Sequence, residues 1–128
     1  LETQLRGLLH FHRLDGYPGR AWTPAQIDSI IFGHYPTPAE EAHFSALYGV
    51  SLRELVDVHM RHECTPYCLR GGTTCRFGFP HALNPKTHWT DSGYLHVHRG
   101  EGDEDIATYN PHLLCTTRAH VYVTLVRG

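Results

Sequence analysis

The sequence predicts an α+β fold, in which a short antiparallel sheet is flanked by helices. Three observations carry this prediction. Strand-like alternation opens the chain, helix start signals recur in its first half, and a β-branched apolar segment lies near its end. With 128 residues, 41% of them hydrophobic, the chain can form one modest domain with its own core. We expect residues 1–128 to be a single partial domain, continued in a longer protein.

Residues 1–14 are predicted to form a β-hairpin, because apolar and polar residues alternate on either side of a glycine turn. His10 and His12 then lie on one face of a strand, since side chains two positions apart point the same way. Both imidazoles can reach a single divalent ion. Gln4 and Glu2 lie across the turn, and an oxygen atom from the preceding strand could complete the site.

Residues 23–62 are predicted to be mainly helical. Thr23 and Thr37 are each followed by proline, which is typical of a threonine N-cap with proline at the first helical position. Ser51 and Glu54 have the spacing of a capping box. A glycine is expected to end each of the first two helices, and the third runs directly into a cluster of cysteines.

Residues 59–80 are predicted to form a zinc knuckle. The cluster offers one imidazole nitrogen and three thiolates, the donor set of a structural zinc site: His62, Cys64, Cys68 and Cys75. His59 is the alternative nitrogen ligand. A closed site of this kind leaves no position for a substrate and would brace a loop-rich stretch. The competing interpretation is three reduced cysteines that pack as small apolar groups.

Residues 94–126 are predicted to supply strands at 94–98 and 119–126, the second of them buried because it is rich in β-branched residues. His96 and His98 repeat the His-x-His pattern, and we expect them at a solvent-facing strand edge. The fourth cysteine of the chain is predicted to be a packed free thiol.

The formal net charge of −2 at pH 7 does not indicate a surface that binds nucleic acid throughout. Arg70, Arg76 and Arg118 are candidates for phosphate contacts, although each is equally suited to a surface ion pair. The acidic run at 101–105 is expected to be a solvated loop. No stretch has the roughly 18 apolar residues of a membrane helix, and no signal peptide is visible. We therefore expect an intracellular protein without a membrane partner.

Four ordered segments resemble Helitron-type rolling-circle replication initiators, which belong to the HUH endonuclease class. Residues 1–12 (LETQLRGLLHFH) are similar to the family's ETQ-x-RG-x-x-H-x-H segment. Residues 58–83 resemble its histidine-and-cysteine element, here ending in CRFGFP. The link YPTP at 35–38 matches in the same order, as does a single segment at 109–123 that contains YNPHLL and AHVYV.

The resemblance implies an antiparallel sheet of HUH type with a zinc-knuckle insertion. It also implies that His10 and His12 hold Mg²⁺ or Mn²⁺, with Gln4 as the expected third ligand and Glu2 as its rival. In the family, this ion polarises a DNA phosphate that a tyrosine attacks, forming a covalent intermediate. That tyrosine is expected beyond Gly128, so whether this chain is itself an enzyme is left open. Single-stranded DNA and a helicase domain of the same polypeptide are the implied partners, in the nucleus if the host is eukaryotic.

The early turn after His12 and the negative net charge keep two other functions under consideration. The chain turns after His12, where the family continues an apolar strand, and it contains no G-x4-GK-[ST] phosphate-binding loop. The first rival is a non-catalytic zinc module that binds nucleic acid. The second is an interaction domain in which zinc is structural and DNA is irrelevant.

Overall fold

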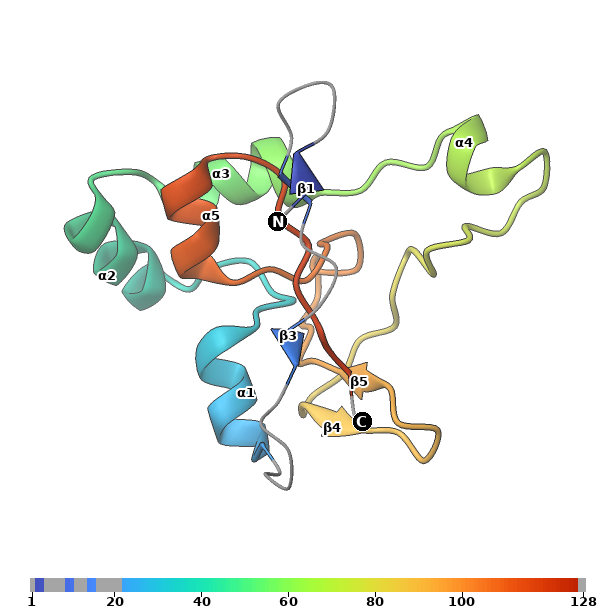
Figure 1. Ribbon diagram of the computed structural model, residues 1–128, viewed down its shortest axis with the longest axis horizontal. Helices are drawn as coiled ribbons and strands as arrows, with labels where there is room; N and C mark the ends of the chain where they lie inside the picture. The colour runs from blue at the N-terminus through green and yellow to red at the C-terminus, as the bar shows by residue number, and fades with distance from the viewer. Residues whose placement is uncertain (1, 4–8, 11–13, 16–21, 127–128) are drawn as a thin grey trace.

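The computed structural model describes the backbone of residues 2–3, 9–10, 14–15 and 22–126, and the side chains of residues 22–125. The described helices are short and lie mainly in the first half of the chain (Figure 1). They are α1 (Pro24–Ile30), α2 (Pro38–Tyr48), α3 (Leu52–Leu55), the π-helix η1 (Val56–Met60), α4 (Pro66–Leu69) and α5 (Pro111–Thr117).

The first two helices begin where the sequence predicts. Thr23 and Thr37 are N-caps, and in both cases proline occupies the first helical turn. Thr23 accepts a hydrogen bond from the Gln26 amide at 3.2 Å, and Gln26 returns one by accepting from the Thr23 amide at 2.9 Å. Thr37 and Glu40 form the same reciprocal pair. These capping boxes satisfy amides that the first turn of a helix leaves without partners.

The expectation that glycines end both helices is right for α2 and wrong for α1. Gly49 caps α2 with φ of 68°, a left-handed conformation that favours glycine. Helix α1 ends earlier, at Ile30, and its cap Ile31 is extended. Gly33 has a different role, because a Cβ atom there would overlap the Cγ2 atom of Val97. The residue is a point of close approach between two segments.

Helix α3 is capped partly by another helix. Ser51 accepts from the Glu54 amide at 3.2 Å, which is one half of the predicted capping box. The Ser51 hydroxyl in turn donates to the Glu41 carboxylate, which also accepts from the Arg53 amide, both at 2.9 Å. A carboxylate from α2 therefore holds the start of α3. The π-helix η1 continues directly from α3 and carries the chain towards the cysteines.

The described strands form three two-residue pairs. Strands β1 (Glu2–Thr3) and β2 (Leu9–His10) are antiparallel, as are β4 (His88–Trp89) and β5 (Leu95–His96). Strands β3 (Leu14–Asp15) and β6 (Leu125–Val126) are parallel. The described part of the chain thus mixes helices with two small antiparallel pairs and one parallel pair, and the parallel pair departs from the predicted antiparallel sheet. Two predictions need correction: residues 14–15 form a strand where a turn was expected, and the C-terminal strand covers 125–126 instead of 119–126.

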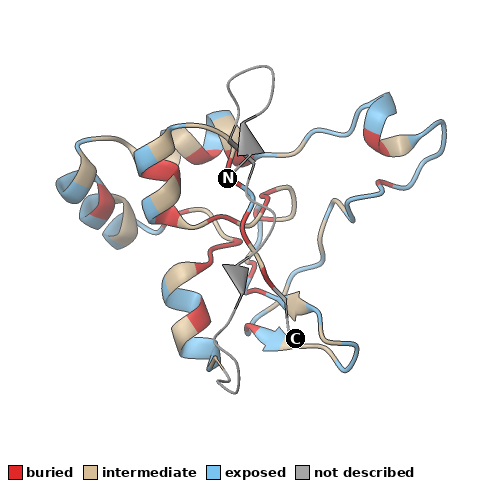
Figure 2. Ribbon diagram, in the orientation of Figure 1, coloured by how far each residue is buried: buried red, intermediate tan, exposed pale blue. Residues whose placement is uncertain are grey.

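Two clusters of buried side chains make up the described core (Figure 2). The first joins α2, α3, η1 and α5: Phe32, Phe44, Leu52, Val56, Met60, Ile106, Ala107, Tyr109, Leu114 and Cys115. The second lies between α1 and the C-terminal segment: Ile27, Ile31, Val97, Val121, Val123 and Leu125. The predicted burial of the C-terminal segment holds for Val121, Val123 and Leu125, whereas Tyr122 is exposed and most of the segment is not a strand. No helix within the described ranges combines the length and the apolar character needed to cross a membrane.

The acidic segment at 101–105 is not the fully solvated loop that its composition predicts. Asp103 is buried and accepts hydrogen bonds from the Tyr35 amide at 2.9 Å and the Gly100 amide at 2.8 Å. Arg99 is also buried and donates to the Asp103 and Ile106 carbonyl oxygens at 2.8 and 2.6 Å. Buried polar groups are stable when they are paired in this way. The loop is thus part of the interior framework.

We predict that Asp103→Ala lowers the free energy of unfolding by about 2 kcal/mol, because two partly buried amides lose their acceptor and Arg99 loses a nearby carboxylate. Chemical denaturation measures this change. The matched control is Glu101→Ala, an exposed carboxylate of the same loop, with an expected change within about 0.5 kcal/mol. Equal effects of the two substitutions would contradict the framework role of Asp103.

Candidate metal centre

Three of the four cysteines lie on an arm, residues 62–80, that extends away from the helices of the core (Figure 1). Its near end is held by backbone hydrogen bonds: the Ala107 amide donates to the Met60 carbonyl at 2.8 Å, and the His62 amide donates to the Asp105 carbonyl at 2.7 Å. The Arg61 side chain adds ion pairs with Asp57 at 2.9 Å and with Asp105 at 2.7 Å. These bonds place His62 at the base of the arm.

The far end of the arm returns to the same loop. The His81 amide donates to the Glu104 carbonyl at 2.8 Å. A few residues later, Asn84 and Arg99 exchange two backbone hydrogen bonds of 3.0 and 2.9 Å. Both ends of the arm are thus fastened to the 99–106 segment. Between these points, the arm has to be ordered by contacts of its own.

The arm brings together all four predicted zinc ligands. The Nε2 or Nδ1 atom of the histidine and the three sulfur atoms lie within 4.8 Å of one another: His62, Cys64, Cys68 and Cys75. The Nε2 atom of His62 is 3.5 Å from the Cys75 sulfur. Around a tetrahedral zinc ion the donors are roughly 3.5–4 Å apart. The cluster can therefore hold a metal ion such as zinc after a small contraction.

Local backbone geometry orients two of the sulfur atoms. The Thr65 amide points to the Cys68 sulfur at 3.3 Å, and the Phe77 amide points to the Cys75 sulfur at 3.4 Å. A hydrogen bond of 3.0 Å from the Arg76 amide to the Cys68 carbonyl joins the backbone beside Cys75 to the backbone at Cys68. At Cys75, amide donors directed at the sulfur lower the pKa and so favour the thiolate form that a metal ion requires. This is a structural reason, independent of spacing, to regard the cluster as a metal site.

Glycines with left-handed backbone conformations allow the arm to turn tightly around the cluster. Helix α4 ends at Arg70, and Gly71 follows with φ of 77°. Gly78, three residues after Cys75, has φ of 82°, and its amide donates to the Cys75 carbonyl at 3.0 Å. Glycine adopts such angles without steric cost. The glycines thus permit the return that brings Cys75 to the other ligands.

The thiols differ in acidity in the metal-free chain. Desolvation, followed by hydrogen bonds and charge interactions with Cys68 and Cys75, raises the pKa of Cys64 to about 11. In Cys75 burial acts to raise the pKa, but hydrogen bonds from the Phe79 and Phe77 amides outweigh it, and the pKa lies below its usual value. Before a metal ion binds, the thiols would therefore differ in how readily they lose their protons. The protons that remain would be displaced as the metal ion binds.

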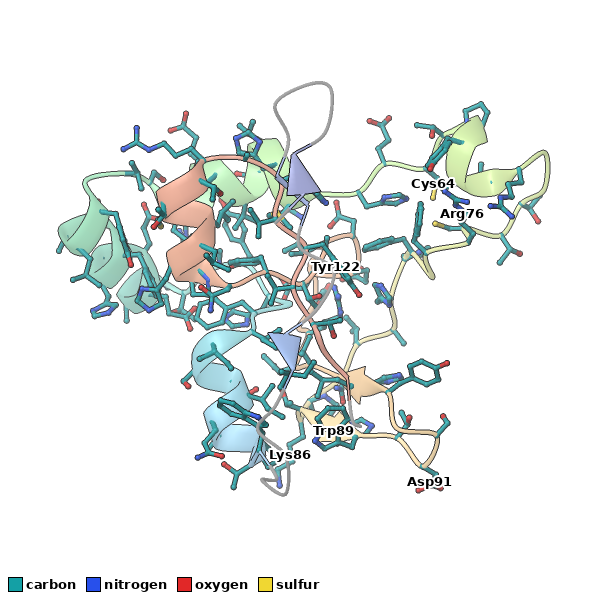
Figure 3. All side chains as sticks on the ribbon, in the orientation of Figure 1. Cys64, Arg76, Lys86, Trp89, Asp91 and Tyr122 are labelled. Carbon is teal, nitrogen blue, oxygen red and sulfur yellow. The ribbon has the colours of Figure 1, made fainter. Side chains whose placement is uncertain are left out.

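Aromatic rings surround the cluster. Phe79 stacks on His62 with ring centroids 4.3 Å apart and an angle of 16°, while Phe77 meets the same imidazole edge-on at 6.0 Å. The Arg76 guanidinium lies over the rings of Tyr67 and Phe77, 4.4 and 4.6 Å from their centroids. Figure 3 shows Arg76 close to Cys64 on the arm. The rings orient the imidazole and cover part of the metal centre.

Four protein ligands complete a tetrahedral zinc site and leave no open position. The arrangement is therefore suited to bracing and not to catalysis. Cys68 and Cys75 are the buried cysteines of the arm, whereas Tyr67 is 72% exposed and Phe77 48% exposed. An arm with so little buried apolar surface would gain order from a bound metal ion.

The other predicted site residues have different outcomes. His59 is not among the four clustered ligands; its carbonyl accepts from the His120 ring at 2.7 Å. Gln4 and His12 lie outside the described residues. Glu2 and His10 are paired across β1 and β2, although their side chains are not described. The Mg²⁺ or Mn²⁺ site therefore stays a prediction.

The arginines proposed for phosphate contacts and the packed cysteine are all described. Arg70, Arg76 and Arg118 are exposed, and Arg70 and Arg118 occupy the left-handed caps that end α4 and α5. Cys115 is 2% exposed in the first core cluster, and burial raises its pKa, as expected for a packed free thiol. His96 and His98 are exposed, as predicted.

A cavity of about 840 Å³ lies beside the base of the arm, and sequence reasoning did not foresee it. Five histidines line it: His62, His81, His88, His96 and His120. Burial, followed by the charges of Arg99 and two neighbouring histidines, lowers the pKa of His81 to about 4. His81 is thus neutral at physiological pH. These histidines come from separate segments without a common spacing, so no sequence signal could have grouped them.

Comparison of the chain with protein-family models, with curated proteins and with solved structures gave no match.

We predict that Cys68→Ser abolishes stoichiometric zinc binding, because a hydroxyl is a poor replacement for a buried thiolate ligand. Atomic absorption on purified protein measures the zinc content. Cys115→Ala is the control: it removes a buried thiol outside the cluster and should retain one zinc ion per chain. One equivalent of zinc in Cys68→Ser would contradict this assignment.

Zinc affinity should also rise with pH. The three ligand thiols must lose their protons, and the Cys64 pKa of about 11 means that ligation itself has to displace one. Each displaced proton lowers the apparent affinity by about tenfold per pH unit as the solution is acidified. Competition with a chromophoric chelator between pH 6 and 8 measures the slope. An affinity independent of pH over this range would argue against thiolate ligands.

Proposed function

We propose that this chain is the zinc-braced part of a metal-dependent single-strand DNA endonuclease of the Helitron replication-initiator type, with an antiparallel sheet of HUH type. The observation that carries the proposal is the convergence of His62, Cys64, Cys68 and Cys75 in one cluster. This cluster lies within residues 58–83, the segment with the most specific resemblance to the family. The other three resembling segments follow the family order and support the same assignment.

In this proposal the endonuclease site lies at the N-terminal hairpin. The antiparallel register that pairs Glu2 with His10 agrees with the hairpin expected there. His10 and His12, with Gln4 or Glu2, would hold Mg²⁺ or Mn²⁺. Such an ion neutralises charge on a scissile phosphate. The residues of this chain would bind the ion and orient DNA, while the attacking tyrosine and the helicase domain would belong to the remainder of a longer, nuclear or otherwise intracellular protein.

A second candidate function is a non-catalytic zinc module that binds single-stranded nucleic acid. One observation favours it: Arg76 is exposed and lies against the rings of Tyr67 and Phe77, next to the metal cluster. Cations combined with exposed aromatic rings are typical of surfaces that contact phosphates and stack on bases. In this case the N-terminal histidines would have no part in DNA binding.

The test is formation of a covalent adduct with labelled single-stranded DNA in the presence of Mn²⁺, read on a denaturing gel. We compare this chain with a version extended by about 50 residues of its natural reading frame, enough for a further strand and helix. Adduct is expected with the extended protein. His10→Ala should abolish it, whereas His43→Ala, an exposed histidine of α2, should not.

The outcomes separate the two functions. Adduct that survives His10→Ala would overturn the assignment of the metal ligands. If neither protein forms adduct, but both bind single-stranded DNA in a salt-sensitive manner that Cys68→Ser abolishes, the non-catalytic zinc module is the better description. Absence of both activities would leave a structural or interaction role for the zinc-bound arm.

A further inference from the structure

The short ladder of β4 and β5 places two histidines directly opposite each other. His88 pairs with His96, and both side chains are exposed. Their ring centroids are 5.5 Å apart. The next pair of the ladder, Trp89 and Leu95, is half-buried against the second core cluster. Because successive side chains of a strand alternate between faces, the two imidazoles share the face directed away from that cluster.

The tautomer of His88 is determined by its hydrogen bond. Its Nδ1 atom lies 2.9 Å from the Lys86 carbonyl oxygen, which can only accept. Nδ1 therefore carries the proton, and the lone pair of the neutral ring is on Nε2. Histidines that bind metals commonly donate their other nitrogen to a carbonyl in this way, which holds the ring in place and raises the basicity of the ligand atom.

The separation of the rings fits a shared ion. Two imidazoles that bind one tetrahedral ion at about 2.0–2.1 Å have ring centroids roughly 5 Å apart. The observed centroid separation of 5.5 Å, with an angle of 52° between the ring planes, is close to this value. Two imidazole nitrogens without carboxylate or thiolate partners favour Zn²⁺, Cu²⁺ or Ni²⁺ over Mg²⁺ or Ca²⁺.

We propose that His88 and His96 form a second metal site, which takes a divalent transition-metal ion and is distinct from the cysteine cluster. Both residues line the 840 Å³ cavity, so the remaining coordination positions would face it and would be filled by water or an exchangeable ligand. With two protein ligands the site is open, in contrast to the closed set of four on the arm. The proposal does not depend on the endonuclease function.

The first experiment uses the full chain with its cysteine cluster already saturated with zinc and excess zinc removed. Ni²⁺ is then titrated by isothermal calorimetry. We expect His88→Ala and His96→Ala each to lower the affinity for one equivalent of Ni²⁺ by at least about tenfold, because one imidazole ligand remains where two held the ion. His43→Ala, an exposed histidine on α2, is the matched control and should bind as the unmodified chain does.

The N-terminal pair His10 and His12 is a separate candidate for Ni²⁺, so the titration is repeated in a His10→Ala/His12→Ala chain. The equivalent that depends on His88 and His96 should persist there. If the folded His88→Ala/His96→Ala chain binds as many Ni²⁺ ions with the same affinities as the unmodified chain, the proposal is overturned.

A second measurement needs no substitution in the ladder. Substoichiometric Cu²⁺ broadens the imidazole resonances of the histidines that bind it. In the unmodified zinc-loaded chain, selective broadening of His88 and His96 would support the site. Broadening confined to other histidines, with both of these resonances unchanged, would overturn it. Neither outcome bears on the formation of a DNA adduct, so failure here and failure of the endonuclease proposal are distinguishable.

Discussion

The buried pairing of Arg99 and Asp103 is the constraint on which the position of the arm depends. Arg99 donates to two carbonyl oxygens of the loop, and the Asp103 carboxylate accepts from the amides of Tyr35 and Gly100. The same loop provides the Asp105 and Glu104 carbonyls that hold the two ends of the arm. A flexible loop here would leave His62 and the cysteines without a fixed base, because the arm itself buries little apolar surface.

The arm and the core depend on different stabilising interactions. Burial of apolar side chains orders the helices of the first core cluster, where Tyr109 and Leu114 are fully buried. Ordering the arm costs conformational entropy that its few buried side chains do not offset. Convergent thiolates offer a different source of stability, since the free energy of metal binding is also free energy of folding. We therefore expect the arm to lose its order when a chelator removes the metal ion, while the two core clusters stay folded.

The histidines of this chain have several separate roles, despite their common chemistry. His62 joins three cysteines, whereas His34 contacts the Glu40 carboxylate at 2.9 Å. His81 has a pKa of about 4 because it is half-buried near Arg99. His88 and His96 face each other across a ladder. Enrichment in histidine thus predicted metal binding in general, but the surroundings of each ring determine what that ring can do.

The sequence by itself determined the local features of this protein. Threonine followed by proline specified the starts of α1 and α2, and the spacing of the cysteines specified the ligands of the metal centre, because both depend on residues close together in the chain. Only the tertiary structure decided the choice of His62 over His59, the burial of Asp103 and the meeting of His88 with His96. Each depends on contacts between separate segments, and such contacts arise from packing and strand register, which no short pattern of residues encodes.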